Sequence, residues 1–325
     1  PDATFGIKAL SDCAASAGET SSAYDEIMTI NIVSCRSIGI GAYIVRLGQR
    51  VIQVENSYIV LTGNIALNKL LGKEVYTGNS QLGGTHINHP NGVAHSIVKS
   101  DLDSIYQALN WMCMTPKISD GFSFNQLTFT KDPIDRQVLW SPKKGIPYDP
   151  VHLFTGANDA QGRFQPGIAD SNTWHEIMDG WAKTVRVGRC RIGGIAVGVI
   201  TPETRSVTTE IPADPANAES DRKIVRRSGQ VWFPDSSHKT AQAIKDFHRE
   251  QLPLLIIGNW RGFSGGMKDM FDEILKYGAQ IVDELRKYQF PVMVYIPPYG
   301  ELRGGAWAVL DPKINLDFME IYACE

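Results

Sequence analysis

The chain lacks the cysteine patterns that build metal sites or disulfide frameworks. Its cysteines are odd in number and include no CxxC pair. This excludes a four-cysteine zinc module and argues for reduced thiols in an intracellular or organellar compartment. His86 and His89 of "HINH" have no third ligand at metal-like spacing, so we interpret them as loop residues and expect no metal in this domain. The five cysteines are Cys13, Cys35, Cys113, Cys190 and Cys324.

Long apolar runs and an excess of charge of one sign are also missing. The runs "IGGIAVGVI" and "PVMVYI" are far short of the ~20 residues that a membrane helix needs, so we expect buried strands and no transmembrane segment. No basic region followed by an apolar region marks a signal peptide. The formal net charge of −3 over 325 residues gives no electrostatic case for nucleic acid as a partner.

What is present is an alternation of extended and helical segments, which predicts a mixed α/β fold. A chain of this length predicts two domains. Gly72 is expected to cap one helix at its C-terminus, and Asp101 to cap another at its N-terminus. We predict strands at 27–35, 50–55, 189–204 (two strands around a glycine pair), 252–259 and 291–298, and helices at 42–48, 64–72, 101–114, 239–250 and 267–288, the last broken at most at Gly278.

Between residues 132 and 172 this alternation stops. Prolines, glycines and polar residues dominate there, as in a linker or a long surface excursion. We therefore place a domain boundary near residue 131, with domains at 1–130 and 131–325. A basic cluster at Lys223, Arg226 and Arg227 is interpreted as a solvated helix face, with contact to coenzyme A phosphates as the alternative.

Glycine-rich turns follow three apolar segments, at 38–41, 264–266 and 303–305. Such turns leave backbone N–H groups unpaired at a helix N-terminus, where they can hold negative charge. Neither GxxxxGK[ST] nor a GxGxxG after these strands is found, so phosphate-binding fingerprints are absent. The remaining interpretations are an oxyanion hole or simple turn geometry. "CRSIGIGAY" and "LRGGAW" are also similar to one another. Two domains built on the same plan would produce this similarity, and so would chance.

Long blocks of the sequence resemble the carboxyltransferase domain of eukaryotic-type multidomain acetyl-CoA carboxylase. The resemblance covers nearly the whole chain and is loosest in the linker region. It implies an α/β fold of two crotonase-like ββα-spiral domains, a partial N-terminal subdomain at 1–130 and a C-terminal one at 131–325. Among these blocks are "YDEIMTINIVSCRSIGIGAYIVRLGQRVIQVEN", "GWAKTVRVGRCRIGGIAVGVITPETR", "NWRGFSGGMKDMFDEILKYGAQIVD" and "YIPPYGELRGGAWAVLDPKIN".

The resemblance implies transfer of a carboxyl group from carboxybiotin to acetyl-CoA, giving malonyl-CoA for fatty acid synthesis. Biotin would arrive on a carrier domain outside this chain. The implied assembly is a homodimer whose active site lies between the N-subdomain of one protomer and the C-subdomain of the other. The implied compartment is the cytoplasm or a plastid. Transfer to another acyl-CoA such as propionyl-CoA, and a non-catalytic dimerisation or scaffold role, remain as alternatives.

The resemblance also assigns roles to individual residues. Arg36 and Arg261 would hold the transferable carboxylate, which suits the planar guanidinium fork. The N–H of Ile40 would serve an oxyanion hole for the thioester enolate, and those of Gly266 and Gly305 a hole for the biotin ureido oxygen. The resemblance also implies that the ureido nitrogen of biotin takes the proton, and no carboxylate or histidine of the sequence stands out as a general base. The substrate-binding residues would be Gly39, Tyr43, Phe263, Trp232, Leu10 and Ile274.

The extent of the chain differs from the family pattern. It begins inside the family's N-domain and stops before the last helices of the C-domain. The spacing from Gly266 to Gly305, carried back from Ile40, reaches Pro1 or earlier. We therefore expect one amide of the first oxyanion hole to lie outside this sequence, and the isolated chain to be inactive or nearly so.

Overall fold

A computed structural model describes residues 3–115 and 132–324. The chain divides into two compact units, which we describe separately. Unit 1 comprises Pro1–Trp111 and Thr209–Val225, and unit 2 comprises Met112–Thr208 and Arg226–Glu325. The boundary expected between residues 130 and 131 lies outside the described residues.

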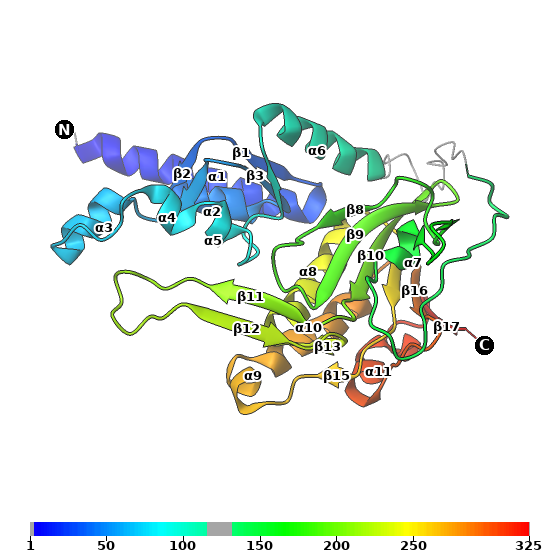
Figure 1. The fold of residues 1–325 in the computed structure, drawn as a ribbon. Coiled ribbons are helices and arrows are strands. Elements are labelled where there is room, and N and C mark those ends of the chain that lie inside the picture. The colour runs from blue at the N-terminus through cyan, green and yellow to red at the C-terminus, as the bar shows by residue number, and fades with distance from the viewer. Residues whose placement is uncertain (1–2, 116–131, 325) are drawn as a thin grey trace. The chain divides into compact units, whose positions relative to one another are not determined.

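Unit 1 is built from short parallel strands and helices (Figure 1). One sheet has the order β1-β3-β5, and β2 pairs with β4 in a second sheet; all of these pairs are parallel. The elements in chain order are α1 (Ala3–Glu26), β1 (Ile30–Val33), β2 (Arg36–Ile38), α2 (Ile40–Leu47), β3 (Arg50–Val54), β4 (Tyr58–Val60), α3 (Asn64–Leu71), α4 (Asn79–Gly83), α5 (Thr85–Asn88), β5 (Ser96–Val98) and α6 (Asp101–Met114), which continues into unit 2.

The Gly72 cap and the bounds of the helix at 101–114 are confirmed, but the Oγ of Ser100, not Asp101, accepts from the N–H of Asp103 at the start of that helix, and His86 lies in α5 and not in a loop. Gly72 ends α3 in the left-handed conformation, with φ 69°, and its N–H bonds to carbonyls of the last turn, as a glycine C-cap does. Helix α6 has the predicted bounds. Its apolar positions Leu102, Ile105 and Leu109 are nevertheless exposed. The core of the unit instead lies between α2 and the two sheets, where Val33, Ala42, Val51 and Ile59 pack together.

A segment of the second half of the chain completes unit 1. Strands β11 (Val207–Ile211) and β12 (Lys223–Arg227) pair with each other, and the residues that join them belong to unit 1. The hydroxyl of Tyr76 donates a hydrogen bond of 2.7 Å to Oδ1 of Asp214 in this segment. The basic cluster that we predicted as a helix face lies in β12, so that prediction of secondary structure is wrong. Arg227 there pairs with Asp235.

A buried histidine makes the stability of unit 1 sensitive to acid. Nδ1 of His95 accepts a hydrogen bond from the N–H of Val51 at 3.2 Å, which requires the neutral ring. Burial lowers the pKa of His95 well below its usual value, and the positive charges of Arg50, Arg46 and His89 lower it further. Below about pH 6.5 the imidazole of His95 therefore binds a proton in the unfolded chain but stays neutral in the folded chain.

We expect this group's contribution to stability to be complete above about pH 6.5 and to be lost as the pH falls below it. Urea unfolding measured from about pH 7.5 to 5 should show a smaller loss of stability for His95→Asn than for the wild type. Asparagine does not titrate, and its Oδ1 can still accept from Val51. Equal pH dependence in the two proteins would contradict the assignment.

Unit 2 contains a larger mixed sheet with helices packed against it (Figure 1). Helices α8 and α10 pack against each other, and α8 contacts β9 and β10. Its elements, besides the ends of β11 and β12, are α7 (His152–Thr155), β6 (Ala157–Asn158), β7 (Phe164–Gln165), β8 (His175–Ile177), β9 (Val185–Ile192), β10 (Ile195–Pro202), β13 (Val231–Trp232), α8 (Pro234–Arg249), β14 (Leu254–Ile257), β15 (Gly262–Phe263), α9 (Met267–Phe271), α10 (Ile274–Lys287), β16 (Val292–Ile296), α11 (Gly304–Leu310), a 3-10 helix at Pro312–Ile314 and β17 (Met319–Ala323).

The sheet of unit 2 has the order β17-β16-β14-β10-β9-β8. Strands β10, β14, β16 and β17 run parallel, while β8, β9 and β10 are joined antiparallel. The hairpin of β9 and β10 turns at Gly193 and Gly194, as predicted, and both glycines have positive φ. Because side chains alternate along a strand, Gly198 of β10 faces Phe247 of α8, where a Cβ would come within 2.7 Å of the ring.

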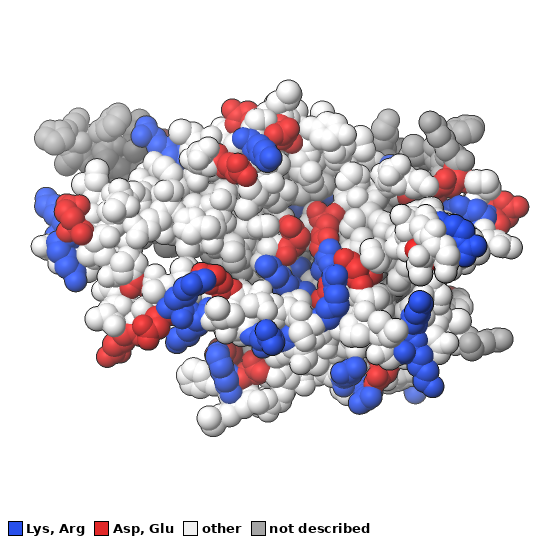
Figure 2. Space-filling view, viewed as in Figure 1, with Lys and Arg blue, Asp and Glu red and all other residues white. Residues whose placement is uncertain are grey.

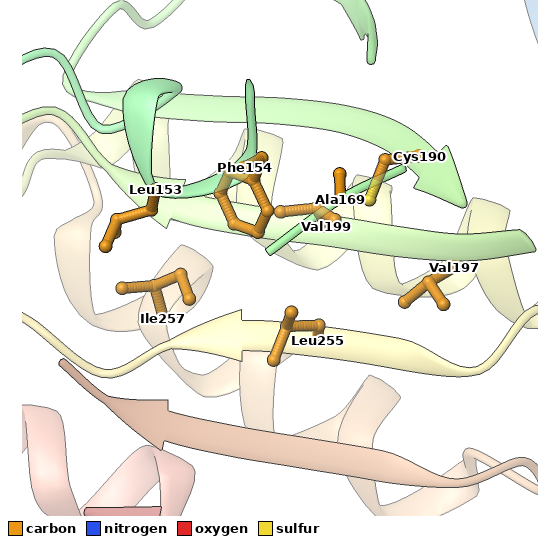
Figure 3. Packing of buried hydrophobic residues seen from close by; sticks show 8 residues of the cluster. All are labelled: Leu153, Phe154, Ala169, Cys190, Val197, Val199, Leu255 and Ile257. Carbon is orange, nitrogen blue, oxygen red and sulfur yellow. The ribbon is translucent and has the colours of Figure 1, made fainter. Parts of the chain in front are cut away.

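The other face of the same strands is covered by the segment that we expected to be a linker. Leu153 and Phe154 of α7 pack with Cys190 of β9, Val199 of β10 and Ile257 of β14, and Phe154 has no exposed surface. Figure 3 shows these side chains converging between α7 and the strands. Residues 132–172 therefore include part of the core, and the interpretation as a linker or surface excursion is wrong.

The helix predicted at 267–288 is two helices. The break between α9 and α10 falls at Asp272 and Glu273, and Glu273 has a left-handed φ of 71°. Gly278 lies inside α10 and does not interrupt it. Its lack of a Cβ admits an aromatic ring, because a Cβ there would lie 3.1 Å from Cε1 of Phe263.

Charges of both signs are interspersed over the face of the molecule shown in Figure 2. A face of this kind does not produce a broad field of one sign. Within the described ranges, no helix combines the length and apolarity required to cross a membrane. Among the same residues, no group of three or more His, Cys, Asp or Glu side chains is placed to hold a metal ion.

Candidate active site

The three glycine turns share one local plan. In each, a strand of the main sheet leads through a short second strand or bridge to a glycine, and a helix begins there. The turns are β1–β2–Gly39–α2 in unit 1, and β14–β15–Gly266–α9 and β16–Leu302–Gly304–α11 in unit 2, where Leu302 bridges to Trp260. Arg36 and Arg261 occupy similar places, each at or beside the short second strand.

These turns leave amides available at helix N-termini. Gly39 has a φ of 65°, a backbone conformation that residues with a Cβ adopt only at a cost in free energy. Its N–H donates a hydrogen bond to the carbonyl of Val60 at 3.0 Å. This conformation starts α2 at Ile40. Within the described parts of the chain, the N–H groups of Ile40, Gly266 and Gly305 meet no acceptor. Free amides in such a position can receive a negatively charged oxygen.

Apart from Leu10, the predicted residues of unit 1 (Arg36, Gly39, Ile40 and Tyr43) are close in sequence and lie around this turn. The side chains of Arg36 and Tyr43 are exposed. Among the residues described, no carboxylate pairs with Arg36. Leu10 lies in α1, but its side chain lies outside the described part of the structure.

In unit 2, Arg261 is held by its main chain and leaves its guanidinium accessible. Its N–H donates to the carbonyl of Gln230 at 2.8 Å. Its side chain is 52% exposed, with Nε 3.9 Å from Oε1 of Glu301. The terminal nitrogens have no acceptor among the described residues. A guanidinium with a free fork can bind a carboxylate bidentately.

An aromatic stack forms the wall next to Arg261. The ring of Trp232 stacks on Trp260 at 4.1 Å and on Phe263 at 4.8 Å between centroids. Phe263 also lies close to the position of Gly305, where a Cβ would be 3.7 Å from its ring. Trp232 and Ile274 are buried in unit 2. Trp232 is therefore inside the stack and not at its surface, and Phe263 is the half-buried residue there.

A polar pocket of about 290 Å³ opens beside Arg261. Tyr148, Gln230, Asn259 and Glu301 are among its lining residues. Burial raises the pKa of Tyr148 to about 12, so its phenol stays protonated at neutral pH. Its oxygen lies 3.4 Å from Nδ2 of Asn259. The hydroxyl proton meets no acceptor within the described ranges, so the pocket offers a neutral donor as well as a cation.

Sequence reasoning missed these four lining residues. Asn259 precedes "WRG" directly at the end of a buried strand, and Glu301 precedes "LRGG". The polar residue placed just after β14 was therefore a usable signal, whereas Glu301 lies beyond a turn, after β16 has ended at Ile296. Tyr148 and Gln230 gave none, because each reaches the pocket from a segment remote in sequence.

Comparison with known proteins identifies the class of protein to which this geometry belongs. The profile of the carboxyl transferase domain matches residues 2–325, so the chain belongs to the carboxyl transferase domain family. It is 50% identical over 320 residues to proteins named acetyl-CoA carboxylase, mitochondrial, from Saccharomyces cerevisiae strains JAY291, Lalvin EC1118 and ATCC 204508 / S288c. Each match covers 98% of this chain and 14% of the yeast protein.

Solved structures confirm the predicted fold class, a mixed α/β fold of the crotonase-like ββα-spiral type. A transcarboxylase 12S crystal structure with methylmalonyl-coenzyme A and methylmalonic acid bound matches with a TM-score of 0.76 at 16% identity. A second, with hydrolysed methylmalonyl-coenzyme A, gives 0.73 at 16% identity. The matches cover 98% of this chain and 56% and 55% of those chains.

The yeast relatives differ from this chain in length, and their name gives a compartment. The chain spans about one seventh of the length of the curated yeast proteins, as the 14% coverage states. Their name also places them in mitochondria, which disagrees with the cytoplasmic or plastid location implied by the resemblance.

Proposed function

We propose that this chain is the carboxyltransferase part of an acetyl-CoA carboxylase. It would move the carboxyl group from carboxybiotin to the methyl carbon of acetyl-CoA, giving malonyl-CoA and biotin. The 50% identity to yeast acetyl-CoA carboxylase over nearly the whole chain carries this proposal. The biotin would be delivered by a carrier domain of the same polypeptide.

Arg261 is proposed to hold the carboxylate that is transferred, and Arg36 to do the same in unit 1. The support is the accessible fork of Arg261 beside a polar pocket. Such a clamp orients the carboxyl carbon toward its acceptor and keeps its charge at every physiological pH.

The free amides are proposed to stabilise the oxygens on which charge develops. The N–H of Ile40 would bind the enolate oxygen of the thioester. Those of Gly266 and Gly305 would bind the ureido oxygen of biotin as the carboxyl group leaves. Each such donor typically lowers the barrier by about 2.7–4 kcal/mol. Gly39, Tyr43 and Phe263 would line the acyl and biotin groove, with Leu10, Trp232 and Ile274 beside or behind it.

We propose that units 1 and 2 correspond to the N- and C-terminal carboxyltransferase subdomains, and that two chains form a homodimer. Apolar side chains next to the proposed site residues support the dimer. Ile40 and Tyr43 are exposed on α2, and Met267, Phe271 and Leu275 are exposed on α9 and α10. Burying surfaces of this kind favours association.

Sedimentation of the full-length protein at micromolar concentration tests the dimer. We expect the wild type to sediment as a dimer or a larger assembly. Phe271→Glu should shift it toward a smaller species, because the exposed ring would be replaced by a charge in the interface. A wild-type protein that stays monomeric would contradict the proposal.

The choice of acyl-CoA tests the function itself. In the full-length protein we expect the kcat/KM for acetyl-CoA to be at least about tenfold above that for propionyl-CoA. A pocket that fits only the methyl group of acetyl-CoA would discriminate against one extra methylene by this amount. Labelled carboxyl transfer to both thioesters measures the ratio. A preference for propionyl-CoA would support the alternative substrate, and transfer to neither would support the non-catalytic role.

A further inference from the structure

The polar pocket of unit 2 contains a buried amide that links the two groups fixing Arg261. Asn259 follows β14 and is 3% exposed. Its Oδ1 accepts a hydrogen bond from Nε2 of Gln230 at 2.6 Å and a second from the N–H of Glu301 at 2.9 Å. These two partners lie far from each other in sequence, so a single oxygen joins two loops.

Each of these partners acts on a different part of Arg261. Gln230 accepts the main-chain N–H of Arg261 at 2.8 Å, and Gln230 itself has a left-handed φ of 61°. A residue without glycine's freedom adopts such a conformation at a cost in free energy, and the conformation persists only where surrounding contacts hold it. The bond from its side chain to Asn259 supplies that restraint.

Glu301 acts on the other end of Arg261. Its Oε1 lies 3.9 Å from Nε of the guanidinium, and its Oε2 contacts Arg303. The carboxylate can meet Nε from one side while the terminal nitrogens remain available, so it orients the fork. The position of Glu301 depends on its main chain, which Asn259 holds.

We propose that Asn259 is a positioning residue for the guanidinium of Arg261, acting through Gln230 on its main chain and through Glu301 on its side chain. This inference rests on the proposed role of Arg261 in holding the carboxylate. Removal of the amide oxygen would take this acceptor away from two part-buried donors and release both restraints together. The fork would then bind carboxylate in many orientations, of which few are productive.

The test is a double-mutant cycle in the full-length protein, assayed by transfer of the carboxyl group from malonyl-CoA to biotin. We expect Asn259→Ala to lower kcat by about 10–100-fold with a smaller change in KM, because the restraint matters for alignment. In the Arg261→Lys background, which has no fork to orient, the same substitution should cost less than about twofold. Such non-additivity identifies residues that act through one another.

Asn315→Ala is the matched control in the same unit. Asn315 also ties loops with its amide, which donates to the carbonyls of Leu285 at 3.0 Å and Tyr288 at 2.7 Å. Its removal should lower the melting temperature by an amount similar to Asn259→Ala and change kcat by less than about twofold. A general loss of stability would therefore be seen with both variants, whereas a loss of turnover would be seen with Asn259→Ala alone.

A second variant covers the case in which Asn259→Ala does not fold. Gln230→Met removes the hydrogen bond to Asn259 while keeping a side chain of similar length. It should lower kcat less than Asn259→Ala does, again with little further effect in the Arg261→Lys background. An unchanged kcat in both single variants, or an equal loss in both backgrounds, would overturn the positioning role. Wild-type turnover of Arg261→Lys alone would instead remove the proposed role of Arg261.

Discussion

Arg261→Lys in the full-length protein should lower carboxyl transfer by about 100-fold or more while the positive charge is kept. Lysine is a point charge on a flexible stem and cannot reproduce the two parallel bonds of a guanidinium fork. A misplacement of about 1 Å at a reacting group can cost on the order of 100-fold in rate. Turnover and thermal midpoint should be measured on one preparation, with the midpoint little changed.

Arg163→Lys provides the comparison for this substitution. Arg163 is exposed in unit 2 and pairs with Asp159 at 2.9 Å, so the same chemical change occurs away from the proposed site. An exposed pair of this kind contributes little, and turnover should stay within about twofold. If Arg261 merely stabilises its turn, Arg261→Lys would keep near-wild-type turnover or lower the thermal midpoint. Either result would contradict the proposed role of Arg261 in the active site.

Lys239→Met should destabilise unit 2 by about 3–5 kcal/mol. Lys239 lies in α8 with no exposed surface, and its ammonium donates to the carbonyls of Met178, Trp181 and Val185 at 2.6–2.8 Å. Methionine fills a similar volume but takes the ammonium donor away from three buried carbonyls, of which that of Met178 keeps the N–H of Trp181 at 3.3 Å. The loop that carries them contains two non-glycine residues with positive φ, Met178 and Ala182, and the ammonium holds it in that conformation.

Denaturant unfolding of Lys239→Met against Lys245→Met measures this cost. Lys245 lies in the same helix with its side chain exposed, so the same substitution there should change stability by less than about 0.5 kcal/mol. Similar values for the two variants would mean that water or a rearranged loop satisfies the carbonyls. The buried lysine would then have no special part in holding the loop.

The elements with continuous local signals were predictable from the sequence. The hairpin of β9 and β10 has two apolar runs around a glycine pair, and α6 has a helical period bounded by Asp101. The break before Glu273 was not predictable, because no glycine or proline marks it and tertiary packing overrides the helical propensity of this segment. Residues 132–172 bury isolated side chains such as Phe154 without any periodicity, so the pattern resembled a loop.

The same division holds for the candidate site. The glycine turns that contain Gly266 and Gly305 were predicted from short glycine-rich motifs after strands, and Arg261 was assigned to the site by the resemblance. The place of Asn259 after a strand was a signal in the sequence, but its hydrogen-bond partners lie 29 and 42 residues away, and a single sequence contains no record of such pairs. The resemblance to a known domain supplied roles for the glycine turns, but the support behind Arg261 required coordinates.

The segment Thr209–Val225 has a consequence for how the protein can be made and cut. Because this segment belongs to unit 1, a ribosome must synthesise the intervening stretch of unit 2 before unit 1 can be completed. No single cut in the chain, including one near residue 131, separates the two units intact. Expression of the first 111 residues alone would leave Tyr76 without Asp214. A soluble form of unit 1 would need the returning segment supplied through an artificial linker.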